Sequence, residues 1–501
     1  MCAGGLFMSS VVTLRGVSFE LTNGRVLFDH LNVSLEDGLT ALVGPNGIGK
    51  TCLARILAGD LNPSVGKVLR SCPVVYFPQR QIPEPITVDE FLGFDYSRDG
   101  FREKLVGNID RDALCTSLSG GEWIRIRLAQ AVAGGFLILD EPTNDLDREG
   151  RELVAQFLRK RKGGALLISH DRECLELCSS VLELSNRGLS KYGGGWQTYL
   201  ETKEQERNAL SHALDCAKRE RDKAVVERHE QRVRQEKRNR QGARNAARGG
   251  IPRILLGSLQ NSAEATLGRV NTETLDSLND AVRNVHEALS QVKVDPVMYV
   301  DLIGAEIPAQ KLVAEASGFN VHFKDWIYQQ DLEFSWRGNV RIALNGRNGS
   351  GKSTLLRAIL GEKFQTRGSL RTGNLTTLYI DQRCEFLDDK QSVLENVQDK
   401  CHLSEMEARN GLARFLFPGE KVFQKVGELS GGERLRAALA RGFLSPAKPE
   451  LLMLDEPTNN LDLTNIEFLE KLVCGFHGAI IVVSHDKTFL QNCSINAELA
   501  L

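Results

Sequence analysis

The sequence has no apolar run that approaches the roughly 20 residues a membrane-spanning helix needs. Its 11 cysteines include no C-x-x-C pair. Cys174 and Cys178 lie four residues apart, but without His or Cys partners at zinc spacing they are expected to be buried thiols. Dispersed cysteines in a large chain are typical of the reducing cytosol. The first residues match neither a secretory signal nor a myristoylation pattern, so a cytoplasmic location is expected.

An excess of charge of either sign is also missing. The chain has 63 Lys and Arg against 65 Asp and Glu, and a net charge of −2 indicates no partner by itself. Its 501 residues suit about three domains. The composition, 42% hydrophobic and 26% charged, is that of a globular protein.

Four motifs occur twice in the same order, separated by similar distances. They are a glycine loop, Leu-Ser-Gly-Gly-Glu, Leu-Asp-Glu-Pro-Thr-Asn and Ser-His-Asp. Two copies of one domain are therefore predicted, at 10–200 and 312–501, with a different segment at 201–300 between them.

Each copy contains short apolar runs that end at a motif. Buried parallel strands have this pattern, with functional residues at their carboxyl ends, so the sequence predicts an α/β fold. The predicted strands are 40–43, 137–139 and 165–168 in the first copy, and 340–344, 451–454 and 479–483 in the second.

The glycine loop has the form G-x-x-x-x-G-K-[ST]. Its backbone N–H groups can close around phosphate oxygens at the start of the next helix. Its lysine is expected to reach the β- and γ-phosphates, and its last hydroxyl to bind Mg²⁺. A single match could arise by chance or in a GTPase, but two matches after apolar strands favour a nucleotide site. The predicted residues are Gly44, Pro45, Asn46, Gly47, Ile48, Gly49, Lys50 and Thr51, and Gly346, Arg347, Asn348, Gly349, Ser350, Gly351, Lys352 and Ser353.

Adjacent carboxylates end one apolar run in each copy. Asp140 and Asp455 are expected to hold Mg²⁺, and Glu141 and Glu456 to act as bases on the attacking water. Phosphoryl transfer needs this division between a metal ligand and a residue that directs the nucleophile. The alternative, solvated acids at a turn, does not explain why Asp-Glu-Pro-Thr-Asn occurs twice.

Two further motifs are expected to contact phosphate. His170 and His485 follow the glutamates at equal spacing and are interpreted as γ-phosphate contacts rather than as structural histidines. The Ser-Gly-Gly turns offer a hydroxyl and bare N–H groups at a helix start. Because each glycine loop already holds its own nucleotide, these turns should serve a facing domain. Their residues are Ser119, Gly120 and Gly121, and Ser430, Gly431 and Gly432.

Together with Gln79 and Gln382, these motifs resemble the ATP-binding cassette family over both copies. The resemblance implies Mg²⁺-dependent hydrolysis of ATP by a head-to-tail pair of cassettes with two ATP molecules between them. Both sites are expected to hydrolyse. The implied metal ligands are Thr51, Gln79, Asp140, Ser353, Gln382 and Asp455.

The same resemblance divides each site between the cassettes. One ATP would be shared by Lys50, Gln79, Asp140, Glu141 and His170 with Ser430 and Gly432, and the other by Lys352, Gln382, Asp455, Glu456 and His485 with Ser119 and Gly121. The aromatic residue that stacks on adenine would be Phe19 in the first copy and Phe323 in the second. Each of the two could equally belong to the core.

The segment 201–300 reads as a helical hairpin. Residues 201–247 are highly charged and almost free of Gly and Pro, which predicts a helix of about 70 Å at about 1.5 Å per residue. Gly249–Pro252 would end it, and a second helix is predicted from Ser258 to Lys293. Heptad spacing predicts packing between Leu210, Ala213, Ala217 and Ala224 on one helix and Leu275, Leu278, Val282, Val285, Leu289 and Val292 on the other.

The far half of this hairpin is strongly basic, with only Glu230 and Glu236 opposing nine positive residues. One interpretation of this basic segment is a helix face that is simply exposed to solvent. Because like charges so close together repel unless a polyanion neutralises them, contact with nucleic acid is favoured. The predicted contacts are Arg228, Arg232, Arg234, Lys237, Arg238, Arg240, Arg244, Arg248 and Arg253.

Paired cassettes joined by a basic helical hairpin resemble the ABC-F subfamily. That resemblance implies a cytoplasmic, monomeric chain that binds rRNA and tRNA at the ribosomal tRNA exit site, and acts in translation or in antibiotic resistance. Between Gln79 and Ser119 there is no room for the arm insertion of some members, so no subgroup is indicated. The alternatives are the motor subunit of a transporter with separate membrane proteins and a DNA-acting ATPase.

Overall fold

The computed structural model describes residues 11–22, 24–79, 81–93, 100–131, 135–144, 146–161, 163–247, 275, 277–287, 305–459, 461–495 and 497–501. The chain divides into two compact units. One combines Met1–Tyr199 with Met298–Leu501 and holds both cassettes, and the other is Leu200–Val297.

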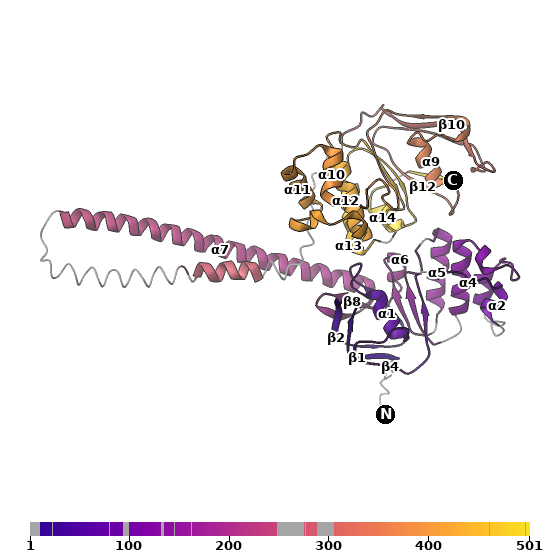
Figure 1. Ribbon diagram of the computed structural model, residues 1–501, viewed down its shortest axis with the longest axis horizontal. Coiled ribbons are helices and arrows are strands. Elements are labelled where there is room, and N and C mark those ends of the chain that lie inside the picture. Colours follow the sequence, from indigo (N-terminus) through magenta and orange to yellow (C-terminus); the bar gives the residue numbers. More distant parts are fainter. Residues whose placement is uncertain are drawn as a thin grey trace, which may run out of the picture. The chain divides into compact units, whose positions relative to one another are not determined.

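The first cassette has two sheets (Figure 1). One is three-stranded and antiparallel, in the order β2-β1-β4, and the other has six strands in the order β5-β6-β7-β3-β8-β9. All neighbours in the larger sheet are parallel except β8 and β9. The elements are β1 (Val12–Glu20), β2 (Val26–Leu35), β3 (Leu39–Val43), α1 (Lys50–Ala58), β4 (Val65–Arg70), β5 (Val74–Phe77), α2 (Val88–Leu92), α3 (Gly100–Val106), η1 (Cys115–Ser117), α4 (Gly120–Ala131), β6 (Phe136–Asp140), α5 (Arg148–Lys160), β7 (Ala165–Ile168), α6 (Arg172–Leu175), β8 (Ser180–Ser185) and β9 (Gly188–Gly193).

The second cassette repeats this plan. An antiparallel sheet has the order β11-β10-β13, and a parallel sheet has the order β14-β15-β16-β12-β17. The elements are β10 (Leu312–His322), β11 (Leu332–Arg337), β12 (Arg341–Asn345), α9 (Lys352–Ile359), β13 (Gln365–Thr372), β14 (Thr377–Ile380), α10 (Val393–Cys401), α11 (Glu405–Arg414), η2 (Gly419–Phe423), η3 (Val426–Glu428), α12 (Gly431–Phe443), β15 (Leu451–Asp455), α13 (Leu463–Gly475), β16 (Ala479–Val483), α14 (Lys487–Asn492) and β17 (Ala497–Ala500).

The parallel strands are apolar throughout because both faces of the sheet are covered. In β6, Leu137 and Leu139 face one hydrophobic cluster, while Phe136 and Ile138 face another on the opposite side. Every residue of β6 and of β15 is buried. The α/β prediction is confirmed, and the predicted strand ends bring the motif residues to the carboxyl edge of each sheet.

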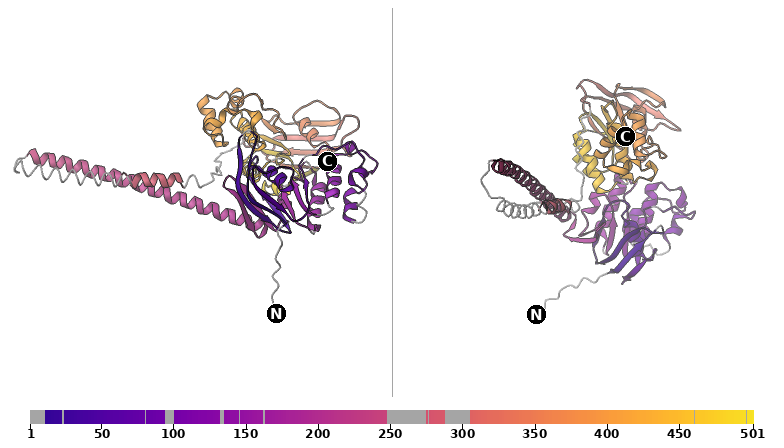
Figure 2. Two further views of the ribbon diagram at one scale, coloured as in Figure 1. Left: turned by 60° about the horizontal axis from the view of Figure 1, so that its bottom comes forward. Right: turned by 60° about the vertical axis from the view of Figure 1, so that its left-hand side comes forward.

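Helix α7 (Gly195–Ala247) is a single unbroken helix of 53 residues (Figures 1 and 2). It begins on buried Trp196 and Tyr199, whose rings stack 5.2 Å apart. Residues 277–287 form a shorter helix beside α7 in both figures. Within the described residues, no helix has both the length and the apolar character needed to cross a membrane.

The packing stripe of the short helix agrees with the predicted heptad at buried Val285 and half-buried Leu278, but differs from it at Leu275 and Val282. Leu275 and Val282 are 41% and 47% exposed, while Ala281 and Val285 are 8% exposed. On α7, Ala217 is buried and Leu214, rather than the predicted Ala213, is half-buried. On the short helix, the unpredicted Ala281 is buried in place of its neighbour Val282. Leu289 and Val292 lie outside the described residues.

Candidate functional site

The glycine loop of the first cassette joins β3 to α1 and folds back around the Lys50 side chain. Gly44, Gly47 and Gly49 have φ values of 151°, 75° and 107°, which side chains rarely adopt. A Cβ at Gly44 would lie 2.3 Å from the Leu184 carbonyl oxygen. The loop can therefore take this shape only with glycine, which leaves its backbone N–H groups accessible to an anion.

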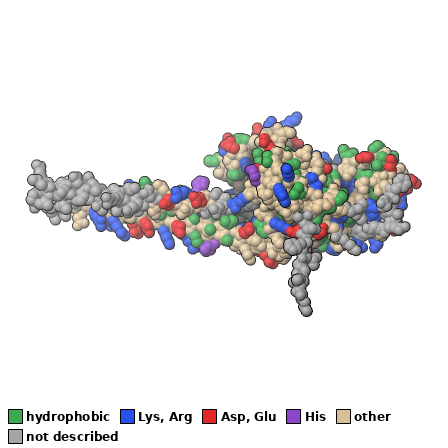
Figure 3. Space-filling model, turned by 90° about the horizontal axis from the view of Figure 1, so that it is seen from below, with side chains coloured by type: hydrophobic (Ala, Val, Ile, Leu, Met, Phe, Trp, Pro, Cys, Tyr) green, Lys and Arg blue, Asp and Glu red, His purple; other side chains and the backbone are tan. Residues whose placement is uncertain are grey.

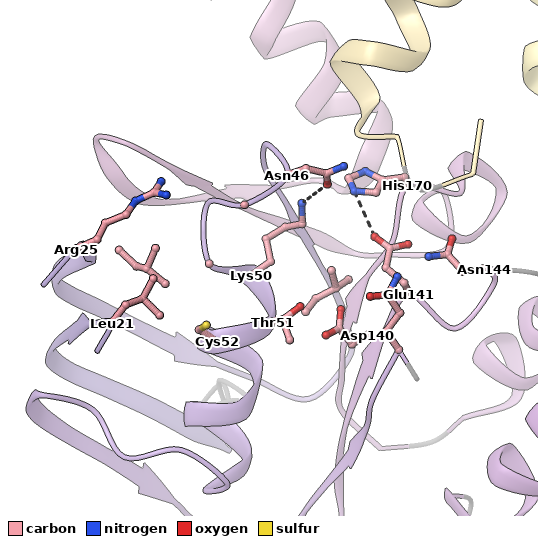
Figure 4. Close-up of a pocket in the computed structure, with 15 residues that line it drawn as sticks. Leu21, Arg25, Asn46, Lys50, Thr51, Cys52, Asp140, Glu141, Asn144 and His170 are labelled. Atoms are coloured by element: carbon pink, nitrogen blue, oxygen red, sulfur yellow. Dashed lines mark hydrogen bonds and ion pairs between the residues drawn. The ribbon is translucent and has the colours of Figure 1, made fainter. Parts of the chain in front are cut away.

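Lys50 lies at the centre of this loop and is 8% exposed. Its Nζ donates to the carbonyl oxygens of Gly44 (2.6 Å) and Pro45 (3.2 Å) and to Asn46 Oδ1 (3.4 Å; Figure 4). Burial lowers the pKa of the ammonium group, while Glu141 counteracts this shift. Lys352 repeats the arrangement, donating to the carbonyl oxygens of Gly346 (2.8 Å) and Arg347 (3.0 Å).

Asp140 ends β6, and Asp455 ends β15. Asp140 is 1% exposed and hydrogen-bonds to the hydroxyls of Thr51 and Tyr76. Burial raises the pKa of Asp140, and those two hydrogen bonds lower it again. Asp455 has the same surroundings, with hydrogen bonds from Ser353 and Tyr379.

The next residue in each cassette is a glutamate on strained backbone. Glu141 has φ 48° and Glu456 has φ 49°. Residues other than Gly, Asn and Asp seldom adopt such left-handed backbone angles. Burial raises the pKa of Glu141 to about 8, against the opposing effect of Lys50. The twist turns each glutamate away from its neighbouring aspartate, so adjacent carboxylates can serve different partners.

A histidine lies against each glutamate. His170 Nε2 is 3.2 Å from Glu141 Oε1 (Figure 4). His485 Nε2 is likewise 3.2 Å from Glu456 Oε1. Burial lowers the pKa of His170 to about 3 and that of His485 to about 4. Each imidazole is therefore neutral at physiological pH. The structure thus brings together the predicted lysine, aspartate, glutamate and histidine in each cassette.

The Ser-Gly-Gly turns begin α4 and α12 as capping boxes. Ser430 Oγ donates to Glu433 Oε2 (2.7 Å) and accepts from the Glu433 N–H group (3.4 Å). Ser119 makes the same pair of bonds with Glu122, at 2.7 and 3.3 Å. Each serine thus caps its helix while presenting its hydroxyl at the helix start.

The two cassettes contact each other through aspartates that follow the Asp-Glu-Pro-Thr-Asn motifs. Asp462 Oδ2 accepts from the Asn46 N–H group (3.1 Å), and Asp147 Oδ2 accepts from the Asn348 N–H group (3.5 Å). Each aspartate also caps its own helix, α13 or α5. Each glycine loop is therefore linked to the residues that follow the carboxylate pair of the other cassette.

A cavity of about 420 Å³ lies over the first glycine loop. It is lined by Asn46, Gly47, Gly49, Lys50, Thr51, Gln79, Asp140, Glu141 and His170 among the predicted residues, and by Leu21, Arg25, Leu27, Cys52, Asn144 and Ile168, which were not predicted. All of these lining residues belong to the first cassette, so Ser430 and Gly432 do not contribute to it.

Of the two alternatives for Phe19, adenine stacking or a place in the core, the structure shows the core. Phe19 is 8% exposed and packs in the core against Phe28, 5.9 Å away between ring centroids. Phe323 is 60% exposed, which leaves its ring accessible.

Comparing the two repeats would also have revealed Tyr76 and Tyr379, because each lies three residues before its motif glutamine.

The predicted nucleic-acid contacts that the structure describes all lie on α7 and are exposed. Arg232 pairs with Glu236 and Arg234 with Glu230, at 3.4 and 3.1 Å. Figure 3 shows Lys and Arg side chains on the visible surface of this helix. The remaining described members, Arg228, Lys237, Arg238, Arg240 and Arg244, form no ion pair with another described residue. Arg248 and Arg253 lie outside the described residues.

Comparison with known proteins identifies both repeats. The ABC transporter domain model matches residues 28–144 and 329–459. ATP-binding protein Uup from Caulobacter vibrioides is 31% identical, over 96% of this chain and 76% of its own length. Ribosome protection protein VmlR from Bacillus subtilis is 26% identical, over 99% of this chain and 87% of its own length.

The fold also matches that of solved structures. A solved structure titled RNase-L Inhibitor matches 97% of this chain and 87% of its own, with a TM-score of 0.58 and 18% identity, which supports the fold alone. The two domain matches and the 31% identity over 96% of the chain show the family. The chain belongs to the ABC-F family of ATP-hydrolysing, ATP-binding cassette proteins.

Proposed function

We propose that this chain binds the ribosome in its ATP-bound state and leaves it after hydrolysis, acting in translation or in protection from ribosome-targeting antibiotics. The observation that carries the proposal is the membership of the ABC-F family, in which VmlR is named a ribosome protection protein. The exposed basic segment of α7 provides a surface for RNA, which here would be rRNA and tRNA.

The donor set beside each glycine loop fits Mg²⁺. Thr51, Asp140 and Gln79 in the first cassette, and their counterparts Ser353, Asp455 and Gln382 in the second, offer hydroxyl, carboxylate and amide oxygens, the ligands that Mg²⁺ prefers. When bound, Mg²⁺ neutralises charge that develops on the β- and γ-phosphates. These residues would hold it directly or through water.

The remaining residues position ATP and the attacking water. Lys50 would exchange its carbonyl contacts for phosphate oxygens. Glu141, once deprotonated, would accept a proton from the water, and neutral His170 would contact the γ-phosphate while holding Glu141 at 3.2 Å. In the second cassette, the same roles would fall to Lys352, Glu456 and His485.

The serine turns would complete each site from the opposite cassette when the pair closes on ATP. The link between Asp462 and the Asn46 N–H group supports this, because it already brings the end of one motif to the other cassette's glycine loop. In a closed state, Ser430 and Gly432 would contact the γ-phosphate held by Lys50. Ser119 and Gly121 would serve Lys352.

Electrostatics favours RNA as the target of α7. From residue 228 to residue 244 the helix carries seven basic side chains and two acidic ones. Neutralising phosphates with such side chains releases counterions, so binding should weaken steeply with added salt. Action on ribosomes would place the protein in the cytoplasm.

The experiment is sedimentation of the full chain with ribosomes. The variant Glu141→Gln with Glu456→Gln should retain ATP and pellet with ribosomes in ATP but not in ADP. Changing Arg238, Arg240 and Arg244 to Glu in that background should abolish pelleting. The matched control changes Arg207, Lys218 and Arg219 to Glu, the same charge elsewhere on α7, and should still pellet.

The rival functions give different outcomes. Recovery of the trapped variant with membranes would favour a transporter motor, and hydrolysis stimulated by DNA would favour a DNA-acting ATPase. A trapped variant that binds ATP but never pellets with ribosomes would overturn the ribosome proposal. The assignment of ATPase activity to the natural chain would still hold.

A further inference from the structure

The two cassettes differ where β1 and β10 turn toward the glycine loops. The Leu21 N–H group donates to the Arg25 carbonyl (2.9 Å), and the Phe323 N–H group donates to the Asp325 carbonyl (3.2 Å). Leu21 thus corresponds to Phe323, and Arg25 to Asp325. One cassette has an aliphatic and a basic side chain where the other has an aromatic and an acidic one.

Both turns lie against the glycine loops. A Cβ at Gly49 would be 3.2 Å from Leu27 Cδ1, and a Cβ at Gly351 would be 2.4 Å from Ile327 Cγ2. The Tyr328 hydroxyl also donates to the Gly351 carbonyl oxygen (3.1 Å). Because the turns are fixed to the loops that would hold the triphosphate, they lie within reach of the rest of the nucleotide.

The first cavity has no Phe, Tyr or Trp among its 15 lining residues. In Figure 4, Leu21 and Arg25 lie on one side of Lys50, while Glu141 and His170 lie on the other. If the phosphates lie at Lys50 and hydrolysis occurs at Glu141, the base and sugar fall on the side of Leu21 and Arg25. A base there meets aliphatic groups and a guanidinium.

The second cassette presents aromatic rings at the equivalent place. Phe323 and Trp326 are 60% and 42% exposed, large values for such side chains beside a glycine loop. Phe364 contacts Phe323 edge to face at 5.8 Å, and Arg367 lies over Trp326 at 4.7 Å. The contact with Phe364 supports Phe323 while much of its ring stays uncovered, as a stacking surface requires.

We propose that the two nucleotide sites select the base differently: the first accepts any base, and the second selects by stacking on Phe323. The proposal rests on the assignment of the nucleotide to the glycine loops. Stacking on an aromatic ring contributes about 1–3 kcal/mol per base and increases with ring area, so purines should be preferred. Aliphatic contacts with Leu21 and Leu27 discriminate much less.

Charge reinforces the difference. Arg25 adds a positive charge to the rim of the first cavity, where the second cassette has Asp325. A guanidinium attracts the triphosphate whichever base it carries. Affinity at the first site is therefore governed by the phosphates, and affinity at the second site depends more on the base.

The test is equilibrium binding of ATP, GTP and CTP to the full chain with one site disabled. Lys352→Ala leaves the first site and Lys50→Ala leaves the second. The three dissociation constants should agree within about threefold at the first site, whereas CTP should bind about tenfold more weakly than ATP at the second, which corresponds to about 1.4 kcal/mol.

Exchanging the key residue should move the preference. Phe323→Leu should remove discrimination at the second site, and Leu21→Phe should create it at the first. Leu69→Phe is the matched control, because it adds the same ring to β4 at an exposed residue outside the cavity lining and should change nothing.

Two failures can be told apart. If neither lysine variant lowers the number of nucleotides bound, the assignment of the glycine loops is wrong. If each variant removes one nucleotide but both sites rank the three bases with equal spread, only the inference on base selection is overturned.

Discussion

The Tyr76 hydroxyl donates a 3.1 Å hydrogen bond to Asp140 Oδ2, and Tyr379 makes the corresponding bond to Asp455 at 3.3 Å. Burial is the main reason that the pKa of each phenol is raised, so each tyrosine remains a donor. The bond fixes the carboxylate that we propose as a ligand of Mg²⁺. Tyr76 is therefore a positioning residue.

Removing this bond should weaken the metal site. In a Glu456→Gln background, Tyr76→Phe should raise the Mg²⁺ concentration for half-maximal ATPase activity about fivefold, equivalent to about 1 kcal/mol, with little change in kcat at saturating Mg²⁺. Tyr379→Phe in the same background is the control and should not change it. An unaltered metal dependence for Tyr76→Phe would leave the phenol a packing role only.

The pH dependence of hydrolysis should report Glu141. Its carboxyl is protonated below about pH 8 and must lose that proton to act as a base. With only the first site active, through Glu456→Gln, kcat/KM should rise about tenfold per pH unit toward pH 8 and then level off. His170 stays neutral in this range because burial lowers its pKa to about 3. A flat profile between pH 6 and 9 would contradict this assignment.

The same shift affects stability with a definite sign. The folded protein holds the Glu141 proton more tightly than the unfolded chain, whose ordinary glutamate pKa is 4.5. Its contribution is therefore complete below pH 4.5 and is lost as the pH rises through about 8. Glu141→Gln should remove that slope from the pH dependence of unfolding.

A buried ion pair joins the cassettes at Arg172 of α6 and Glu470 of α13. The guanidinium makes two bonds, at 2.6 and 3.3 Å, and the side chains are 12% and 11% exposed. Arg172→Ala should lower the free energy of unfolding by about 3 kcal/mol, because Glu470 would stay buried without its cation. Thermal unfolding of the full chain would measure this loss.

Two further variants sharpen that experiment. Arg172→Met with Glu470→Leu should recover most of the stability, since no charge is then left buried. Lys487 occupies the position equivalent to Arg172, and its contact with Glu173 is exposed. Lys487→Ala should therefore cost less than about 1 kcal/mol. Equal losses for Arg172→Ala and Lys487→Ala would refute a special contribution of the buried pair.

Capping and phosphate binding by Ser430 can be separated with aspartate. Ser430→Asp keeps a good N-cap, so stability should change little, but its charge would repel the γ-phosphate proposed to meet it. Activity in a Glu456→Gln background should fall about 100-fold, a loss typical of removing one donor to a developing charge. Ser430→Ala, by contrast, should cost about 1 kcal/mol of stability. Full activity of Ser430→Asp would place this turn outside the site.

The architecture of each cassette was predictable because its strands are apolar on both faces and end at charged motifs. The runs 137–139 and 451–454 gave β6 and β15 to within a residue at either end. A repeated sequence also fixes equivalent positions without any structure. The tyrosines behind Asp140 and Asp455 were accessible to the same comparison.

Other features depend on contacts between distant segments. Phe19 lies on the strand that precedes the glycine loop in the sequence. The side of β1 that it faces is buried, so it packs against Phe28. In the hairpin, the burial of Ala281 rather than Val282 depends on which face of α7 the short helix meets, whereas periodicity alone favours the larger Leu275 and Val282. The Arg172–Glu470 pair joins residues of different repeats and has no local signature.

The left-handed backbone at Glu141 and Glu456 bears on any attempt to arrest the protein. Such a conformation costs about 1–3 kcal/mol, and the surrounding sheet and turn must enforce it. A glutamine at either position has nearly the same size and backbone preference as glutamate, so it should keep the same left-handed conformation. Replacing each glutamate with glycine should relieve this backbone strain. The variant should then unfold at a higher temperature than the natural chain, but without hydrolysing ATP.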